Sequence, residues 1–171
     1  MKPYRQGDLD GLCGIYSIVN SVRYIKKLNT EESEELFYKC LRLAEKKRKL
    51  STIVKEGSSL PVLINIFNEI VDIQYGIKST RPFHKRKDVS LGCYWDYVVT
   101  FLEVPGRAVL AGIDCENAEG HWSVVVKATP KTFYLMDSYY EKLWHRRKMS
   151  TKRISINRPY LVAPTHSFFL G

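Results

Sequence analysis

The spacing of apolar side chains changes once along this 171-residue chain, near residue 72, and that change narrows the choice of fold. Before it, apolar residues recur every three to four positions, as they do on the buried face of a helix. After it, short apolar runs of strand length are separated by turns that contain Pro and Gly. This order predicts an α+β fold in which N-terminal helices precede an antiparallel β-sheet.

Three helices are predicted in the first part of the chain. The first covers residues 13–28, and the second begins at a cap formed by Asn29 or Thr30, followed at once by a run of glutamates. Asn and Thr side chains accept hydrogen bonds from free helix amides, and acids favour the positive end of a helix. The third helix begins after Ser59 and continues to about residue 71.

The second part of the chain is predicted to hold one short helix, at residues 95–103, and several extended segments. These segments are residues 71–77, 108–113, 122–127, 132–136 and 160–170. A short turn at Pro130 joins two of them, which we therefore expect to be antiparallel neighbours.

The length and composition predict one soluble domain, residues 1–171. A chain of this size buries roughly 70% of its unfolded surface, so it needs neither disulfides nor a structural metal. No apolar run approaches the ~18 residues of a membrane span, and the N-terminus lacks the apolar segment of a signal peptide. We therefore expect a cytoplasmic protein without a membrane span.

The four cysteines, Cys13, Cys40, Cys93 and Cys115, lie singly along the chain. They form no Cys-x-x-Cys pair, and no Cys and His spacing suits zinc. This pattern predicts free thiols in a reducing compartment, and neither a metal nor another cofactor.

The chain carries an excess of positive charge. Lys and Arg number 27 against 18 Asp and Glu, a formal net charge of +9. Such an excess fits binding to nucleic acid, to an anionic membrane surface or to an acidic protein substrate, and it also fits a charge that only aids solubility. The excess is concentrated in clusters at residues 46–49, 85–87 and 146–148, of which only the third has aromatic neighbours, at Tyr139, Tyr140 and Trp144. Nucleic-acid binding is therefore the less favoured of these interpretations.

The most informative segment, residues 6–16, reads QGDLDGLCGIY. Cys13 would open the first helix, where the positive end of the helix dipole and free amides favour a thiolate. Gly11 and Gly14 would let a substrate carbonyl approach the backbone closely. The backbone amide of Cys13 and the side-chain amide of Gln6 could then donate to the oxyanion formed during attack. These features predict a cysteine nucleophile.

A general base is predicted much further along the chain. His121 stands at the head of one predicted strand, and Asp137 follows the next strand. The chain between them runs out and back along two antiparallel neighbours, so we expect the two side chains to meet at one edge of the sheet. Asp137 would then orient the His121 imidazole and stabilise its protonated form.

The four candidate residues follow one another along the chain in the order Gln6, Cys13, His121 and Asp137. This order, with the cysteine opening a helix and His and Asp on successive strands, resembles the papain-like cysteine peptidase superfamily. Within it, the GHWSVVV strand at 120–126 and the MDS motif at 136–138 are most similar to the bacteriocin-processing, double-glycine peptidases. The resemblance implies a papain-like fold, a Cys-His-Asp triad and an oxyanion glutamine.

Other cysteines and histidines have structural interpretations. Cys40 lies on an apolar helix face and is interpreted as a core residue. His84, His145 and His166 lie in basic or loop settings, where solvated side chains are expected.

Asp96 and Asp114 are rivals of Asp137 as the acid that orients His121, but neither follows the strand of His121. Trp122 is interpreted as a cleft wall or a core residue rather than as a clamp on the substrate.

Three functions remain open from the sequence. The first is a thiol hydrolase that cleaves a peptide or isopeptide bond through an acyl-enzyme, on a protein or peptide substrate that is acidic if the basic surface guides it. The second is a glutamine deamidase or transglutaminase-like acyl transferase with the same triad, because the first acyl transfer is common to both. The third is a non-catalytic basic module that binds nucleic acid or anionic lipid.

Overall fold

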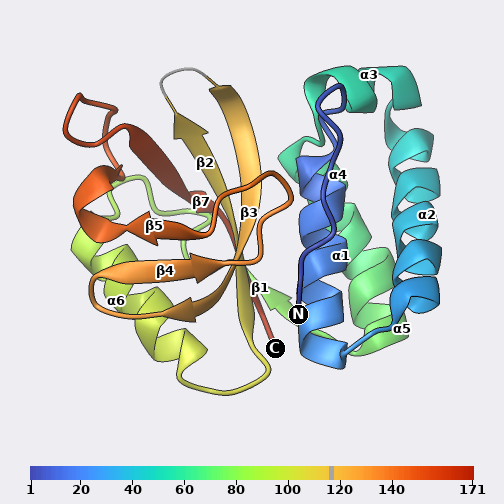
Figure 1. Cartoon of the computed structure of the whole chain (residues 1–171), viewed down its shortest axis with the longest axis horizontal. Coiled ribbons are helices and arrows are strands. Elements are labelled where there is room, and N and C mark those ends of the chain that lie inside the picture. Colours follow the sequence, from blue (N-terminus) through green and yellow to red (C-terminus); the bar gives the residue numbers. More distant parts are fainter. Residues whose placement is uncertain (116–117) are drawn as a thin grey trace.

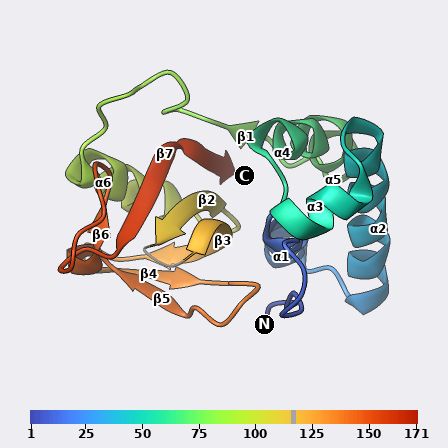
Figure 2. The same ribbon diagram turned by 90° about the horizontal axis from the view of Figure 1, so that it is seen from above.

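The computed structural model describes residues 1–115 and 118–171, with the backbone alone described at 118 and 119. Figures 1 and 2 show the N-terminal helices on one side and a mainly antiparallel sheet with one further helix on the other. The predicted α+β fold, with helices first and the sheet second, is confirmed. Among the described residues, no helix has both the length and the apolar character needed to cross a bilayer.

The first two helices begin where the sequence indicates. α1 (Cys13–Lys26) is followed by α2 (Thr30–Lys47), and Asn29 caps α2. The Asn29 side chain accepts from the Glu32 amide at 3.0 Å, while the Glu32 carboxylate accepts from the Asn29 amide at 2.8 Å. This reciprocal pair satisfies amides that a helix start otherwise leaves free.

The third predicted helix is longer than expected. α4 (Leu60–Ile66) continues through a π-helical turn, η1 (Phe67–Asp72), into α5 (Ile73–Tyr75). The extended segment predicted at 71–77 is therefore wrong: the buried side chains of η1 join the same core as those of α4. The helix ends at Gly76, which has a left-handed φ of 59° that glycine adopts without strain.

The other predicted elements are confirmed with small shifts of their ends: α6 (Leu91–Leu102), β2 (Ala108–Cys115), β3 (Ala118–Ala128), β4 (Thr132–Leu135) and β7 (Tyr160–Leu170). Further short elements have no counterpart in the predictions: α3 (Leu50–Glu56), β1 (Ser79–Thr80), β5 (Leu143–His145), η2 (Arg146–Lys148) and β6 (Met149–Ser150). The strand order is β1-β7-β2-β3-β4-β5, and β6 pairs with β7 in parallel at one end. As predicted, β3 and β4 are antiparallel neighbours.

The sheet carries a core on each of its faces. On one face, Leu110 and Trp122 join the buried side chains of α1, α2 and α4. On the other face, the buried residues of α6 pack against the sheet, and Trp95 stacks on Phe133 with ring centroids 3.5 Å apart. Figure 1 shows α1 as the helix beside β3, so α1 is the element that joins the helices to the sheet.

Two glycines let α1 approach its neighbours closely. A Cβ at Gly14 would lie 3.1 Å from Ser58 and 3.3 Å from Trp122, and one at Gly11 would lie 2.9 Å from the backbone nitrogen of Gly57. We expected both glycines to make room for a substrate carbonyl. In the structure that room is filled by the chain itself, and the glycines serve internal packing.

Substitution Gly14→Val should destabilise the protein by about 1–3 kcal/mol, because the added methyl groups have no space between α1, Ser58 and Trp122. The free energy of unfolding in urea measures this. Glu31→Val is the matched control, since Glu31 holds the same second position in α2 and its side chain is exposed. An equal loss in both variants would show that Gly14 is not needed for close packing.

Candidate active site

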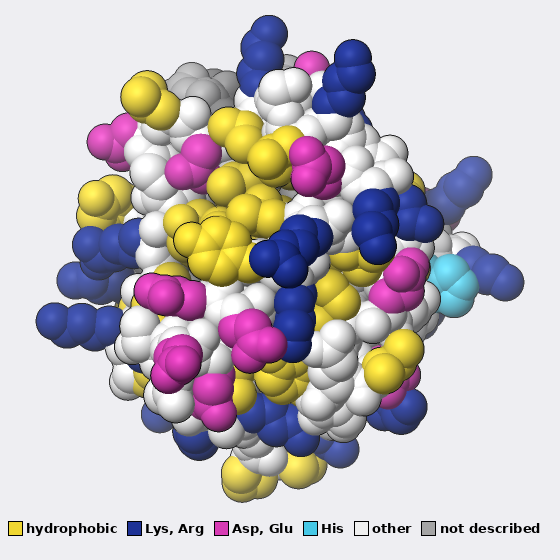
Figure 3. Space-filling view, turned by 90° about the vertical axis from the view of Figure 1, so that its right-hand side faces the viewer, with side chains coloured by type: hydrophobic (Ala, Val, Ile, Leu, Met, Phe, Trp, Pro, Cys, Tyr) yellow, Lys and Arg dark blue, Asp and Glu magenta, His cyan; other side chains and the backbone are white. Residues whose placement is uncertain are grey.

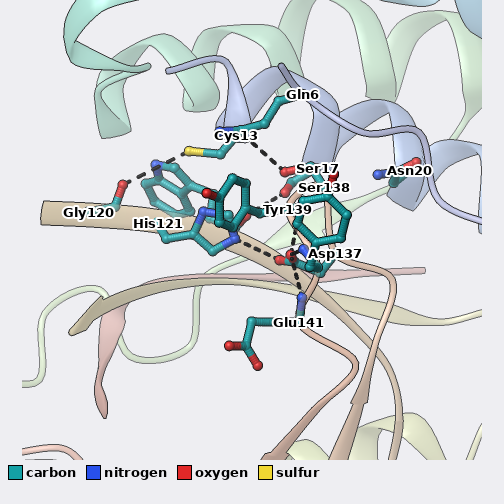
Figure 4. Close-up of polar contacts among 12 residues, drawn as sticks. Gln6, Cys13, Ser17, Asn20, Gly120, His121, Asp137, Ser138, Tyr139 and Glu141 are labelled. Carbon is teal, nitrogen blue, oxygen red and sulfur yellow. Dashed lines mark hydrogen bonds and ion pairs between the residues drawn. The ribbon is translucent and has the colours of Figure 1, made fainter. Parts of the chain in front are cut away.

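Cys13 is the first residue of α1 and faces β3 (Figure 4). Its Sγ lies 4.0 Å from the carbonyl oxygen of Gly120, and its exposed fraction is 5%. One turn further along α1, the Ser17 hydroxyl donates to the carbonyl oxygen of Trp122 at 2.8 Å. This bond ties the helix that begins with Cys13 to the strand that carries His121.

His121 and Asp137 meet at the edge of the sheet, as their placement on successive strands predicts. His121 Nε2 lies 2.7 Å from Asp137 Oδ2. The Asp137 side chain is fully buried, whereas that of His121 is 21% exposed. Because Nε2 is engaged by Asp137, Nδ1 is the ring nitrogen that remains for Cys13.

Asp137 also fixes the turn that follows β4. Its Oδ1 accepts hydrogen bonds from the backbone amides of Tyr139 at 2.7 Å, Tyr140 at 3.1 Å and Glu141 at 3.2 Å. One oxygen of the carboxylate therefore holds the turn, and the other holds the imidazole. This double anchoring leaves Asp137 little freedom to rotate away from His121.

The pair shifts the protonation of both side chains. Burial raises the pKa of Asp137, but the hydrogen bond with His121, the charge of His121 and the hydrogen bond from the Tyr139 amide outweigh burial and lower it. Burial lowers the pKa of His121, but hydrogen bonds and charge interactions with Asp137 and Cys13 outweigh it and raise the pKa to about 10. At neutral pH the geometry thus favours an imidazolium that lies between the Asp137 carboxylate and Cys13 Sγ.

Gln6 lies beside Cys13, held by the segment that follows Asp137 (Figure 4). Its backbone amide donates to the Ser138 carbonyl oxygen at 3.0 Å, and the Ser138 hydroxyl donates to Gln6 Oε1 at 3.3 Å. Gln6 Nε2 donates one hydrogen to the Asp10 carbonyl oxygen at 3.2 Å. An amide nitrogen carries two hydrogens, so one remains for an acceptor near Cys13.

Asp10 organises the loop between Gln6 and Cys13, a role that we did not predict. Its carboxylate accepts from the Gly7 amide at 2.7 Å and from the Leu12 amide at 3.0 Å. Aspartate before glycine is a common turn signal, and the Asp10-Gly11 pair is the sequence feature that could have revealed this loop. Ser17 and Ser138 were missed as well, because single serines carry no such signal.

A cleft of about 420 Å³ opens beside Cys13 and His121. One wall is the connection between α3 and α4, residues 56–60, and the other is formed by residues 112–114 of β2 with Ala163 and His166 of β7. Trp122 lies in the wall and in the core together, as expected. The two walls come from opposite groups of elements, so the cleft can take an extended chain between them.

The remaining candidates from the sequence lie outside the Cys13–His121–Asp137 arrangement. Asp114 accepts from the Gly120 amide at 3.1 Å, and Asp96 pairs with Arg146 at 3.2 Å on another part of the surface. Cys40 is fully buried, as predicted, and burial raises its pKa to about 12.

The other histidines are separate from the pair as well. His84 and His145 are exposed, and each bonds locally through Nδ1, to the Arg81 carbonyl oxygen and the Thr132 hydroxyl respectively. His166 is exposed but lines the cleft, where partial burial and the nearby charge of Arg81 lower its pKa.

Metal ligation has no support in the geometry. Within residues 1–115 and 118–171, no group of three or more His, Cys, Asp or Glu side chains is placed to hold a metal ion.

No protein-family model, no curated protein and no solved structure matches the chain. The interpretation of the site therefore depends on its own geometry.

The His121–Asp137 pair should make stability depend on pH on the alkaline side. Because the folded pKa of His121 is raised to about 10 from 6.5, its contribution is complete below about pH 6.5 and is lost as the pH rises toward 10. Urea unfolding across this range should show a steeper decline for the wild type than for His121→Gln. Parallel curves would show that the imidazole gains no proton on folding.

Proposed function

We propose that this chain is a papain-like cysteine peptidase that hydrolyses a peptide or isopeptide bond through an acyl-enzyme on Cys13. The observation that carries the proposal is the anchored His121–Asp137 pair directly beside a thiol at a helix N-terminus. Nucleophile, base and orienting acid in mutual reach are the requirements of covalent acyl transfer. Helices before an antiparallel sheet, with the thiol on the first helix and the base on the sheet, suit this fold.

The geometry supports a definite sequence of steps. Cys13 Sγ, as the thiolate of an ion pair with the His121 imidazolium, attacks the substrate carbonyl carbon, and the resulting oxyanion receives hydrogen bonds from the Cys13 amide and from Gln6 Nε2. The His121 imidazolium gives its proton to the leaving amine as the C–N bond breaks. A water molecule then loses a proton to His121 and attacks the thioester. This step releases the carboxylic acid and restores Cys13 and His121 to their starting state.

Asp137 is a positioning residue in this scheme. It holds the tautomer and orientation of the imidazole, and it stabilises the positive charge that His121 carries before it protonates the leaving amine and again after it takes a proton from water. Its three backbone amide bonds keep the carboxylate in place while the charge changes.

Two reactions are compatible with the same residues: hydrolysis of a backbone amide, and acyl transfer or deamidation at a glutamine side chain. Both begin with the same thioester, and the cleft beside Cys13, which has walls from both groups of elements, supports a backbone substrate. Mass spectrometry of treated protein substrates decides: cleaved chains support the proposal, whereas intact chains with a glutamate or a new amide crosslink at glutamine favour acyl transfer at a side chain.

Iodoacetamide should alkylate Cys13 faster than the exposed Cys93 at neutral pH, although Cys13 is far less exposed. The reason is the imidazolium of His121 beside Cys13, whose positive charge stabilises the negative charge that the sulfur carries as it attacks the reagent. Intact-mass measurement followed by peptide mapping gives the order of labelling. Faster labelling of Cys93 would contradict the assignment of the nucleophile.

Substitution Cys13→Ala should abolish release of 4-nitrophenol from 4-nitrophenyl acetate beyond the background rate, and it should leave the fold intact. Cys40→Ala is the matched control: removing this buried side chain should cost about 0.5–3 kcal/mol of stability and spare the activity. Wild-type turnover by Cys13→Ala would remove this residue from the mechanism.

Substitution Gln6→Ala should slow acylation of Cys13 by roughly 100- to 1,000-fold, the usual effect of removing one oxyanion donor. Single-turnover kinetics with a saturating ester substrate isolate this step. Gln74→Ala serves as the control, because Gln74 accepts a bond from Lys39 on the helical surface and lies outside the cleft. Equal acylation rates for wild type and Gln6→Ala would show that Gln6 does not donate to the oxyanion.

A further inference from the structure

A second cavity, of about 710 Å³, lies on the sheet side of the molecule and is larger than the active-site cleft of about 420 Å³. Its walls are the turn between β3 and β4, the start of η2, the first turn of α6 and Arg158. None of these residues lines the cleft beside Cys13. Figure 1 shows β5 and α6 on the side of the sheet away from α1, so the cavity and the cleft are separate.

Among the described residues, every charged side chain that lines the cavity is basic, although Asp96, which is outside the lining, pairs with Arg146 at 3.2 Å. Lys131, Arg146, Arg147 and Arg158 line it together with His145, and no acidic residue is among its lining residues. The helical face behaves differently: Figure 3 shows Lys and Arg interspersed there with Asp and Glu. Several cations around one concave surface repel each other, and an anion between them removes that repulsion.

The cations are held in place by the fold. The Arg146 amide donates to the Lys131 carbonyl oxygen at 2.9 Å, and the Arg146 guanidinium bonds to Asp96 and to the Pro130 carbonyl oxygen. Arg158 belongs to a tight turn closed by two backbone bonds with Ser155. Such anchoring lowers the entropy that a ligand must remove when it binds.

The first turn of α6 forms a further wall. Ser90 accepts from the amides of Cys93 and Tyr94, and the two residues before them, Leu91 and Gly92, line the cavity. A Cβ at Gly92 would lie 3.4 Å from a terminal nitrogen of Arg146, so this guanidinium rests directly on the start of the helix. Amides at a helix start and an arginine beside them both suit phosphate oxygens.

Among the described residues, no Trp, Tyr or Phe side chain lines the cavity. Trp144, beside the Arg146–Lys148 cluster in sequence, is only 2% exposed, and Trp95 is fully buried with Arg146 over its ring. Tyr139 and Tyr140 follow Asp137 at the active site instead. The lining therefore suits phosphate groups rather than bases.

We infer that this cavity binds a compact anion with several phosphate groups, free in solution or as the headgroup of a lipid. The inference concerns a site separate from Cys13 and holds whether or not the chain is a peptidase. It is tested by calorimetric titration of the full chain with inorganic triphosphate, in buffers of matched ionic strength. One-to-one binding is expected, and its absence would overturn the inference.

The double variant Arg147→Gln and Arg158→Gln should raise the Kd for triphosphate by about tenfold or more, because charged hydrogen bonds are lost at two exposed side chains. Arg42→Gln with Lys46→Gln removes the same charge from exposed positions of α2 and should change the Kd less than about twofold. Equal losses in both double variants would show that binding follows net charge alone, and would overturn the inference.

Two further arms identify the source of the anion. Phosphatidylcholine vesicles with phosphatidylinositol bisphosphate test a lipid headgroup, and inositol trisphosphate in solution tests a free anion; loss of either binding in the Arg147 and Arg158 variant supports the site. Duplex DNA that binds more tightly than triphosphate, with the same sensitivity to this variant, would overturn the compact-anion inference in favour of nucleic acid. Unchanged labelling of Cys13 by iodoacetamide confirms that the variant retains its fold at the cleft.

Discussion

The close contact between α1 and β3 brings the thiol and the imidazole of the candidate active site together. Gly14 allows the approach, and the bond from Ser17 to the Trp122 carbonyl oxygen fixes the helix along the strand. Cys13 precedes these contacts on the helix, and His121 precedes Trp122 on the strand. The distance between the thiol and the imidazole is therefore set by the packing of two backbone segments. This packing fixes the distance more firmly than contacts between flexible side chains would.

The Asp137 carboxylate joins the stability of a turn to the orientation of the base. The same ionised group accepts three backbone amides and the imidazole, so its protonation would weaken the turn and release His121 together. A buried carboxylate is stable only when such partners compensate for the loss of water. The turn after β4 and the orientation of His121 thus both require the ionised form of Asp137.

Much of the fold could be predicted, because amphipathic helices and long strands leave a clear periodicity. The segment 71–77 could not, since a short run of alternating residues also fits a buried helix turn, and here the core of α4 continues into it. Cys13 and Asp137 could be selected because each lies at or just beyond the end of an element, and His121 because a recognisable motif surrounds it near the start of β3. Ser138 could not be selected, because its bond to Gln6 arises only once distant segments meet, whereas Asp10 makes local loop contacts that the Asp10-Gly11 pair could have indicated.

The hairpin of β3 and β4 connects the two sites proposed for this molecule. Its open end carries His121 and leads into Asp137, while its closed turn, with Pro130 and Lys131, lines the basic cavity. A ligand in the cavity would contact the turn of the strand pair that holds the base. Any effect of such a ligand on binding at Cys13 must be matched by an equal effect of that binding on the ligand's affinity, because coupling between two sites is reciprocal. The hairpin is the shortest covalent path for this coupling, since the chain runs from His121 to the turn and back to Asp137.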